Sequence, residues 1–431
     1  MLDKFFKTIE KITPVKYRWI LNHDGFKRYF ANTGWMFFGQ MFSLLVSFFI
    51  GAWLARYLGP ENYGVLSYAV AFVGLFAFMA DLGAGGILNR ELVKFPEKRD
   101  ELMGTVFRMK LIGGSLAMVL ATGAALIIKM NPLARLLIIV FSISSVLQAM
   151  NVISIYFQAK VEAKSNVLAQ MTATFISSIL KIAAILSGRG IIWIIIIFLL
   201  DIIWQGLGFM AAYRREGLKI RAWRFKNSLA REIWHSSWPL MLASAAFYIY
   251  LRIDQVMIGQ MLGNYEVGLY AAAVKLVEVW YFIPVIIAGS LFPAIVNAKK
   301  TSAAVYHQRL KNFFIFMGLI SVLIILPVTL LARPLIYWLF GVNFLAAVPI
   351  LKVYAWSSVG LLLGIAVSQY LMVENKVKTI FIINIFAMII NIGLNLVFIP
   401  MFGLIGAAWA TLISYLVLPV GAWVVGTIKI I

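Results

Sequence analysis

Long apolar segments recur along this chain, and each is about as long as a membrane is thick. A helix of roughly 20 residues, at about 1.5 Å per residue, crosses a hydrocarbon core of about 30 Å. Only 13% of the 431 residues are charged and 62% are hydrophobic, which leaves too little polar surface to cover a soluble globule. We therefore predict an all-α polytopic membrane protein with about 12 transmembrane helices, at 31–56, 63–88, 103–128, 133–157, 166–187, 191–213, 235–262, 266–296, 312–332, 344–372, 379–399 and 404–428.

The basic residues are distributed unevenly between the loops on the two sides of these helices. The chain has 38 Lys and Arg against 17 Asp and Glu, a net charge of +21. With the amino terminus inside, most of the Lys and Arg fall in loops on the inner side, as the positive-inside rule requires. We therefore expect a multi-pass protein of the cytoplasmic (inner or plasma) membrane with both termini cytoplasmic. The excess of basic residues then reflects orientation and contact with membrane lipids, so nucleic acid is not an expected partner.

The predicted spans fall into two groups of six. A basic cytoplasmic linker at 214–234 separates an N-lobe at 31–213 from a C-lobe at 235–431. Residues 1–30 form a basic cytoplasmic or interfacial segment, in which 1–13 has an apolar face suited to the membrane surface.

A short repeat relates the two lobes. "LGPENYG" (58–64) and "LGNYEVG" (262–268) each contain Leu-Gly, four residues and a second glycine, and each follows the first span of its lobe. This favours duplication of a six-helix unit. Because six is an even number, both copies have the same topology, so we expect a pseudo-twofold axis along the membrane normal and a cavity between the lobes.

Motifs for several kinds of chemistry are absent from the sequence. No stretch matches the phosphate-loop spacing G-x4-G-K-[ST], so the chain is not expected to hydrolyse nucleotide. The three histidines lie in or near cytoplasmic segments without metal-ligand spacing, and there is no cysteine. We predict no catalytic residue, no metal site and no bound cofactor.

Charges near the span ends are counted with the adjoining loops, including those of the basic segment 90–110, and eight further charged residues lie inside the predicted spans. Each costs at least about 2.5–3.5 kcal/mol at mid-bilayer, so they must face one another or water. Arg252 and Asp254 lie about 200° apart around a helix and cannot pair, whereas Lys275 and Glu278 share one face. Lys181 and Lys352 have no acidic neighbour in their own helices. The eight residues are Asp81, Lys181, Asp201, Arg252, Asp254, Lys275, Glu278 and Lys352.

These charges support two interpretations. They could only hold helices together within each lobe. Alternatively, unpaired cations in a polar cavity would bind an anionic ligand, in particular a pyrophosphate, with Arg252 as the central anchor because its planar fork binds phosphate oxygens in pairs. In that case the substrate-binding cations are Arg252, Lys181, Lys275 and Lys352. Asp254, Glu278, Asp81 and Asp201 then pair with charges or bind a coupling ion, Na⁺ or H⁺.

Two further patterns concern helix packing. The stretch "DLGAGGILNREL" (81–92) and the prolines Pro284 and Pro293 predict bends in the second and eighth spans. Asn384, Asn391 and Asn395 recur on one face of the eleventh span and predict hydrogen bonds between helices.

Several stretches together resemble one family. "NTGWMFFGQ" (32–40), "ARYLGPENYGVLSYAVAF" (55–72), "ADLGAGGILNREL" (80–92), "RIDQVMIG" (252–259) and "NLVFIPMFGLIGAAWAT" (395–411) are similar to the polysaccharide-unit (O-antigen-type) flippases. These form a branch of the multidrug/oligosaccharidyl-lipid/polysaccharide exporter superfamily, and the resemblance covers about 30–428.

The resemblance implies a function. A flippase of this kind translocates a polyprenyl-pyrophosphate-linked oligosaccharide across the cytoplasmic membrane by alternating access, for polysaccharide biosynthesis, and is not an enzyme. Expected partners are the lipid-linked substrate, membrane lipids and a polymerase or glycosyltransferase of the same pathway. The alternatives are a cation-coupled multidrug extrusion antiporter of the same superfamily, a non-transporting assembly subunit, and a lipid-modifying enzyme.

Overall fold

The structure is a computed structural model that describes residues 24–424, which are mostly helical and contain no strand. The interfacial helix predicted at 1–13 lies outside the described residues. Ten described segments are long and apolar enough to cross a membrane. Two of them, Asn32–Gly74 and Lys378–Trp423, contain a glycine at which the chain turns back, so each crosses twice. The predicted count of about 12 crossings is confirmed.

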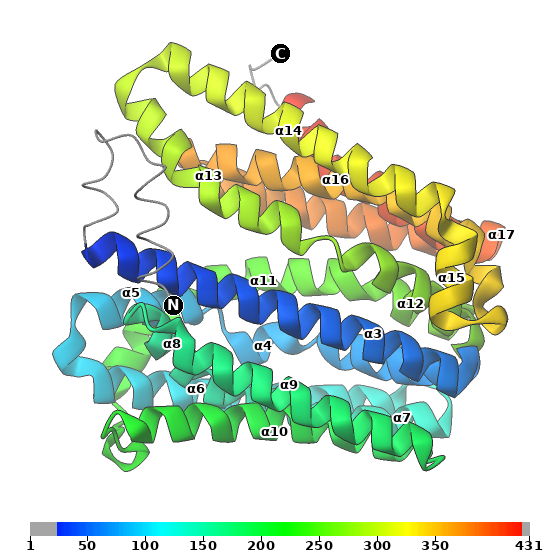
Figure 1. Ribbon diagram of the computed structural model, residues 1–431, viewed down its shortest axis with the longest axis horizontal. Coiled ribbons are helices and arrows are strands. Elements are labelled where there is room, and N and C mark those ends of the chain that lie inside the picture. The colour runs from blue at the N-terminus through cyan, green and yellow to red at the C-terminus, as the bar shows by residue number, and fades with distance from the viewer. Residues whose placement is uncertain (1–23, 425–431) are drawn as a thin grey trace, which may run out of the picture.

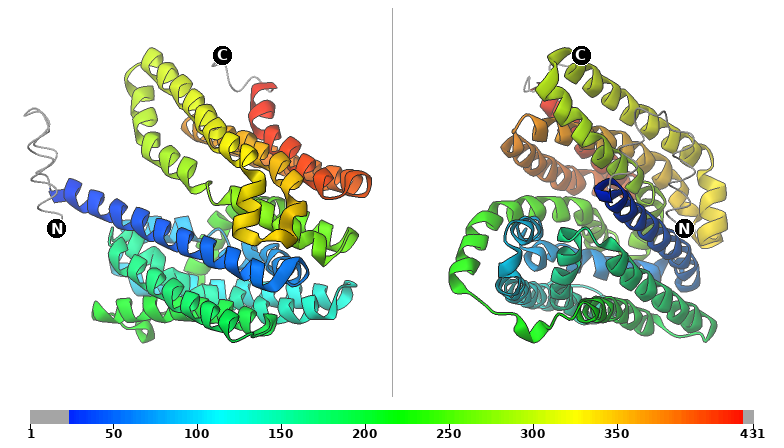
Figure 2. Two further views of the ribbon diagram at one scale, coloured as in Figure 1. Left: turned by 45° about the vertical axis from the view of Figure 1, so that its right-hand side comes forward. Right: turned by 60° about the vertical axis from the view of Figure 1, so that its left-hand side comes forward.

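The helices form two lobes (Figures 1 and 2). The first lobe contains α3 (Asp24–Gly74), α4 (Ala77–Asp81), α5 (Gly85–Lys94), η2 (Pro96–Lys98), α6 (Arg99–Ile127), α7 (Pro132–Leu147), η3 (Gln148–Asn151), α8 (Val152–Ala159), α9 (Ala163–Leu186) and α10 (Ile191–Arg215). After η4 (Ile220–Ala222), the second lobe contains α11 (Asn227–Met261), α12 (Asn264–Glu278), α13 (Phe282–Thr301), α14 (Ala303–Leu330), α15 (Ala332–Phe340), η5 (Val342–Ala347), α16 (Val348–Val373) and α17 (Val377–Val424).

Glycines with positive φ make the turns at one end of the molecule, which we call the glycine end. The φ angle is +69° at Gly59 in α3, +124° at Gly263 before α12 and +59° at Gly403 in α17. Residues with a Cβ rarely adopt this conformation. Across the Gly403 turn, Asn391 Nδ2 donates to Ser414 Oγ at 3.0 Å, so the two halves of α17 lie side by side.

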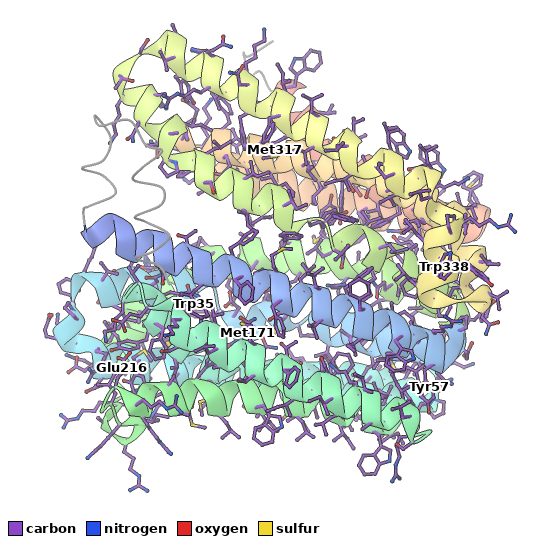
Figure 3. All side chains as sticks on the ribbon, in the orientation of Figure 1. Trp35, Tyr57, Met171, Glu216, Met317 and Trp338 are labelled. Atoms are coloured by element: carbon purple, nitrogen blue, oxygen red, sulfur yellow. The ribbon has the colours of Figure 1, made fainter. Side chains whose placement is uncertain are left out.

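The opposite end carries most of the basic loops, and we call it the basic end. Figure 3 shows Glu216 toward this end, and Tyr57 and Trp338 at the glycine end. The last part of the predicted linker 214–234 is helical, since α11 begins at Asn227. This link packs on the start of α6, where Arg224 N donates to Asp100 O at 3.0 Å.

Two spans are broken near the predicted bends. The second span is interrupted at Leu82 and Gly83, which have φ of +58° and +62°, so the bend predicted at 81–92 is confirmed. The eighth span is interrupted at 279–281, between α12 and α13. Pro284 lies just after this break. A proline lacks the N–H that would bond to the carbonyl four residues earlier, so it weakens the helix at this point. Pro293 lies inside α13.

The repeated glycine motifs meet each other at the glycine end. A Cβ on Gly64 would overlap the carbonyl oxygen of Asn264, and a Cβ on Gly268 would overlap the carbonyl oxygen of Pro60. The contact is therefore reciprocal between equivalent positions of the two copies. It places the pseudo-twofold axis between α3 and α12, and it holds the lobes together at this end.

Candidate functional site

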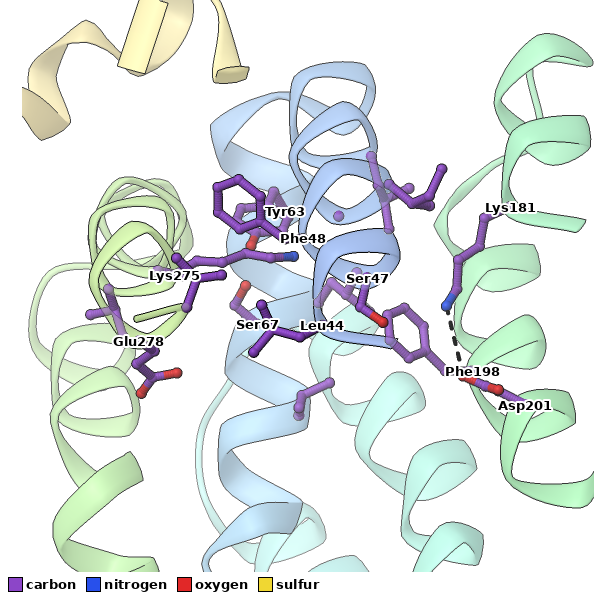
Figure 4. Close-up of a pocket in the computed structure, with 18 of the residues that line it drawn as sticks. Leu44, Ser47, Phe48, Tyr63, Ser67, Lys181, Phe198, Asp201, Lys275 and Glu278 are labelled. Atoms are coloured by element: carbon purple, nitrogen blue, oxygen red, sulfur yellow. Dashed lines mark ion pairs between the residues drawn. The ribbon is translucent and has the colours of Figure 1, made fainter. Parts of the chain in front are cut away.

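A cavity of about 540 Å³ lies between the lobes. Both halves of α3, together with α9 and α10, line it from the first lobe, and α11 and α12 line it from the second. Figure 4 shows side chains of α12 on one side of the cavity, α3 in the middle and Lys181, Phe198 and Asp201 on the other side. The cavity occupies the position that the repeat predicted.

Five charged side chains line the cavity, and all five are among the eight charges that the sequence places inside the spans. Three are cations and two are carboxylates, which gives a net charge of +1 when all are ionised. They are Lys181, Asp201, Arg252, Lys275 and Glu278. A mixed cavity with an excess of one cation suits an anionic ligand better than a cationic one.

The charges of the first lobe form a pair across two helices. Lys181 Nζ in α9 lies 4.0 Å from Asp201 Oδ2 in α10 and 4.3 Å from the centre of the Phe198 ring. The prediction that Lys181 is an unpaired cation was therefore wrong. It considered only acidic neighbours in the same helix, whereas the partner comes from the next helix in the chain.

The charges of the second lobe contain a pair and a third, separate cation. Arg252 Nη1 lies 3.8 Å from Glu278 Oε1, so Arg252 pairs with α12 and not with Asp254, as expected from their helical separation. Lys275 has no ion pair among the described residues. Its side chain reaches across to α3, where a Cβ on Gly51 would overlap Lys275 Nζ. Gly51 thus leaves the space that the ammonium group occupies.

Uncharged polar side chains complete the lining. Gln40, Ser43 and Ser47 lie along α3, and Gln170 and Gln255 come from α9 and α11. The sequence interpretation did not place them in the site. Their signal was weak, but the spacing of 40, 43 and 47 puts three polar side chains on one face of an otherwise apolar span.

A second polar group lies inside the second lobe, away from the cavity lining. We call it the Asp254 cluster. The Asp254 carboxylate, 5% exposed, accepts hydrogen bonds from Tyr270 Oη at 2.9 Å and Thr411 Oγ1 at 2.6 Å. Asn391 Nδ2 donates to Ser414 Oγ on the other half of α17, which confirms the predicted bonding between helices, and Asn395 Nδ2 donates to Asn391 Oδ1 at 3.1 Å within one half. The cluster consists of Asp254, Tyr270, Asn391, Asn395, Thr411 and Ser414.

The Asp254 cluster has the composition of a site for a hard cation. Asp254 Oδ1 and Asn395 Oδ1 are buried and have no hydrogen-bond partner among the described residues. Within the described part of the chain, no three His, Cys, Asp or Glu side chains gather as metal ligands. One carboxylate with amide and hydroxyl oxygens instead suits a monovalent cation or a proton, because oxygen ligands favour hard cations.

Two predicted residues lie outside both groups. Lys352 is exposed in the first turns of α16 and does not line the cavity, so its predicted place there was wrong. Asp81 in α4 pairs instead with Lys110 Nζ in α6, at 3.1 Å. Lys110 is 5% exposed, although the sequence interpretation had counted it with the basic loop segment 90–110. The errors at Lys352 and Lys110 both concern depth along a helix, which the sequence fixes poorly within the first few turns, whereas the ion pair of Asp81 agrees with its predicted charge-pairing role.

A hydrogen-bonded ion pair joins helix ends of the second lobe at the basic end. Glu374 Oε1, just after α16, accepts from Lys299 Nζ at 2.9 Å and from Tyr306 Oη at 2.6 Å. Partial burial acts to raise the pKa of the Glu374 carboxyl, but these two hydrogen bonds outweigh it and hold the pKa below its ordinary value.

Comparison with known proteins identifies the family. The "Probable low-salt glycan biosynthesis flippase Agl15" of Haloferax volcanii is 20% identical, over 89% of this chain and 80% of its own length. The fold is similar to an inward-facing multidrug resistance MATE family transporter (TM-score 0.69, 16% identity, 91% of this chain and 94% of that one). It is equally similar to the lipid II flippase MurJ in an inward closed conformation (TM-score 0.69, 17% identity, 92% and 87%). A family model described as "Polysaccharide biosynthesis protein" matches residues 29–299, and the chain therefore belongs to that family.

Proposed function

We propose that this protein is a flippase that moves a polyprenyl-pyrophosphate-linked oligosaccharide across the cytoplasmic membrane, for polysaccharide biosynthesis. The observation that carries the proposal is a net-positive cavity to which both lobes contribute charge. Membership of the polysaccharide biosynthesis family and similarity to a glycan biosynthesis flippase support the same substrate class. The protein performs no chemistry on its substrate.

The cavity chemistry matches the parts of such a substrate. Arg252 and Lys275 supply hydrogen-bond donors and positive charge for the pyrophosphate, in place of water. The glutamine and serine side chains that line the cavity donate to and accept from sugar hydroxyls. The polyprenyl chain stays in the membrane, because burying it in a polar cavity would lose its favourable apolar environment.

Transport occurs by alternating access of the two lobes. In this structure the reciprocal contact of Gly64 and Gly268 holds the lobes together at the glycine end. Opening that end requires α3 and α12 to separate, which breaks this contact and the apolar packing that surrounds it. The lobes, 31–213 and 235–431, move as units joined by the linker 214–234.

The Asp254 cluster binds the coupling ion, Na⁺ or H⁺. Its two unpartnered oxygens offer ligands to a cation, and Asp254 shares helix α11 with Arg252 of the cavity. Ion binding in the cluster is thereby transmitted along one helix to the substrate site. Both termini lie on the cytoplasmic side, and a polymerase or glycosyltransferase of the same pathway receives or supplies the substrate.

The test is a leaflet-resolved flipping assay. Proteoliposomes are loaded with a polyprenyl-pyrophosphate oligosaccharide, and its access to an impermeant glycosidase is measured with wild type, with Arg252→Ala and without protein. We expect translocation by wild type that collapses in the variant. No movement above empty liposomes, with folding verified and several oligosaccharides tried, would overturn the proposal. Extrusion of an amphipathic cation in the same vesicles would instead support the multidrug antiporter.

A further inference from the structure

A second hollow lies between α13 and α14, near the basic end and away from the charged cavity. It has a volume of about 360 Å³. Its floor is formed by Ile295 and Phe313, which are buried against α16, and its rim by Leu291 and Phe316, which are exposed. In a protein that spans a membrane, this rim faces lipid.

The polar side of the groove offers hydrogen-bond donors and no carboxylate. Arg309 and Asn312 are the polar lining residues. Arg309 Nη1 donates to Ala294 O at 2.6 Å, which leaves most of its five N–H groups free. Asn312 Oδ1 accepts from Gln308 Nε2 at 3.0 Å, so the free atoms of Asn312 are the amide N–H donors. The donors of both residues therefore remain available to an acceptor.

The surroundings of the groove are also basic. Lys300 at the end of α13 and Lys311 in α14 have no ion pair among the described residues. Arg309 lies in the second turn of α14, which starts at Ala303, so it is close to the membrane interface. Basic pockets between transmembrane helices at this depth attract anionic headgroups.

We propose that this groove is a binding site for an anionic phospholipid of the leaflet at the basic end. Arg309 and Asn312 hold the headgroup phosphate, and one acyl chain lies over Phe313 and Phe316. The site is independent of the proposed transport function, because it shares no lining residue with the cavity between the lobes.

Native mass spectrometry of the full-length protein tests the site. The protein is equilibrated with equal amounts of phosphatidylglycerol and phosphatidylcholine that carry identical acyl chains. We expect phosphatidylglycerol to be retained preferentially, and Arg309→Gln to reduce the preference about tenfold, since the substitution removes the charged hydrogen-bond donor. Arg333→Gln is the matched control, because Arg333 is an exposed cation of the same lobe at the glycine end.

A second variant tests the site without disturbing the hydrogen bond that Arg309 makes to Ala294. Asn312→Leu keeps the bond from Arg309 to Ala294 and should still weaken retention several-fold. An unchanged preference in both variants, or an equal loss in Arg333→Gln, would overturn the proposal. Competition by soluble glycerol phosphate as strong as by the lipid would also overturn it, since a lipid site requires the apolar floor.

Discussion

Arg252 and Asp254 are two residues apart in α11, yet they lie in opposite kinds of surroundings. Arg252 is 35% exposed in the cavity between the lobes, and its carboxylate partner is 3.8 Å away. Asp254 is buried inside one lobe, where hydroxyl groups donate to it. A rotation of about 200° between the two positions lets one helix serve both sites.

The comparison teaches that two charges in one span need not share a role. The cavity is bounded by both lobes, so its shape and access change when the lobes move. The Asp254 cluster is made by α11, α12 and α17 of the second lobe only, so such a motion leaves it intact. The first site is suited to a cargo and the second to an ion that is retained during the motion.

The strongest test of the difference is removal of Arg252. Arg252→Ala removes two or more bonds to the pyrophosphate, each worth about 1.5–3 kcal/mol, so transport should fall more than about 100-fold. The flipping assay in proteoliposomes measures it, while ion-dependent thermal stabilisation, which reports the Asp254 cluster, should be unchanged.

Removing Arg252 also leaves Glu278 without its partner, so a second variant is needed. The double variant Arg252→Ala/Glu278→Gln restores charge balance. Transport should stay low in the double variant if Arg252 binds substrate. Recovery to the wild-type rate would show that Arg252 only neutralises Glu278 and does not bind substrate.

The next test acts on the contact that joins the lobes. Gly64→Val places a side chain where Asn264 lies, and overpacking costs about 1–3 kcal/mol, so the closed glycine end should become roughly 5- to 150-fold less populated. The chain has no cysteine, so Ser47→Cys provides a single label in the cavity.

Labelling of that cysteine from the glycine end by an impermeant maleimide should rise in Gly64→Val. Gly123→Val is the matched control, because nothing lies within 4 Å of a Cβ at Gly123. Equal labelling in the two variants would contradict a gate at Gly64 and Gly268.

Two substitutions in the Asp254 cluster test the proposed ion site separately from the cavity. Asp254→Asn should abolish stabilisation by Na⁺ and the effect of protons on transport, and reduce coupled transport about tenfold, a typical coupling of 1–3 kcal/mol. Thr411→Val retains the carboxylate but removes an oxygen ligand. It should weaken the binding of Na⁺ but leave the binding of a proton unchanged. The thermal unfolding temperature, measured with and without Na⁺ at several pH values, therefore identifies the ion.

The smallest effect is expected for an ion pair outside both sites. Because the pKa of Glu374 is lowered in the folded protein, its ionised form adds stability above the unfolded value of about 4.3, and this is lost as pH falls below it. Glu374→Gln should cost less than about 1 kcal/mol at pH 7, and this cost should shrink as the pH falls toward 3. Chemical unfolding in detergent at both pH values checks this, and an undiminished difference at pH 3 would contradict it.

The fold could be predicted from the sequence because the lipid solvent leaves few options. A span of 20 apolar residues must be a helix, and the repeat at 58–64 and 262–268 determined how two lobes are related. The breaks at Gly83 and before Pro284 were also visible, because glycine and proline act on the backbone locally. The depth of residues within the first few turns of a helix was predicted less accurately, and the errors at Lys110 and Lys352 came from this.

The candidate site was only partly visible. Burial cost alone identified all five charges of the cavity, since a charge inside a span must face something polar. It did not identify their partners, because Lys181 and Asp201 meet only when α9 packs on α10. Nor did it show that Asp254 and Arg252 lie in different sites. That depends on which face of α11 is covered by α12 and α17.

The slot that Gly51 leaves for Lys275 has an electrostatic consequence. The ammonium belongs to the second lobe, but it lies against a helix of the first. Any motion that draws α12 away from α3 therefore displaces a full positive charge relative to the Lys181–Asp201 pair. The field inside the cavity is set by the position of the lobes as well as by the residues that line it, so the same side chains can hold an anion in one state and release it in the other without any change of protonation.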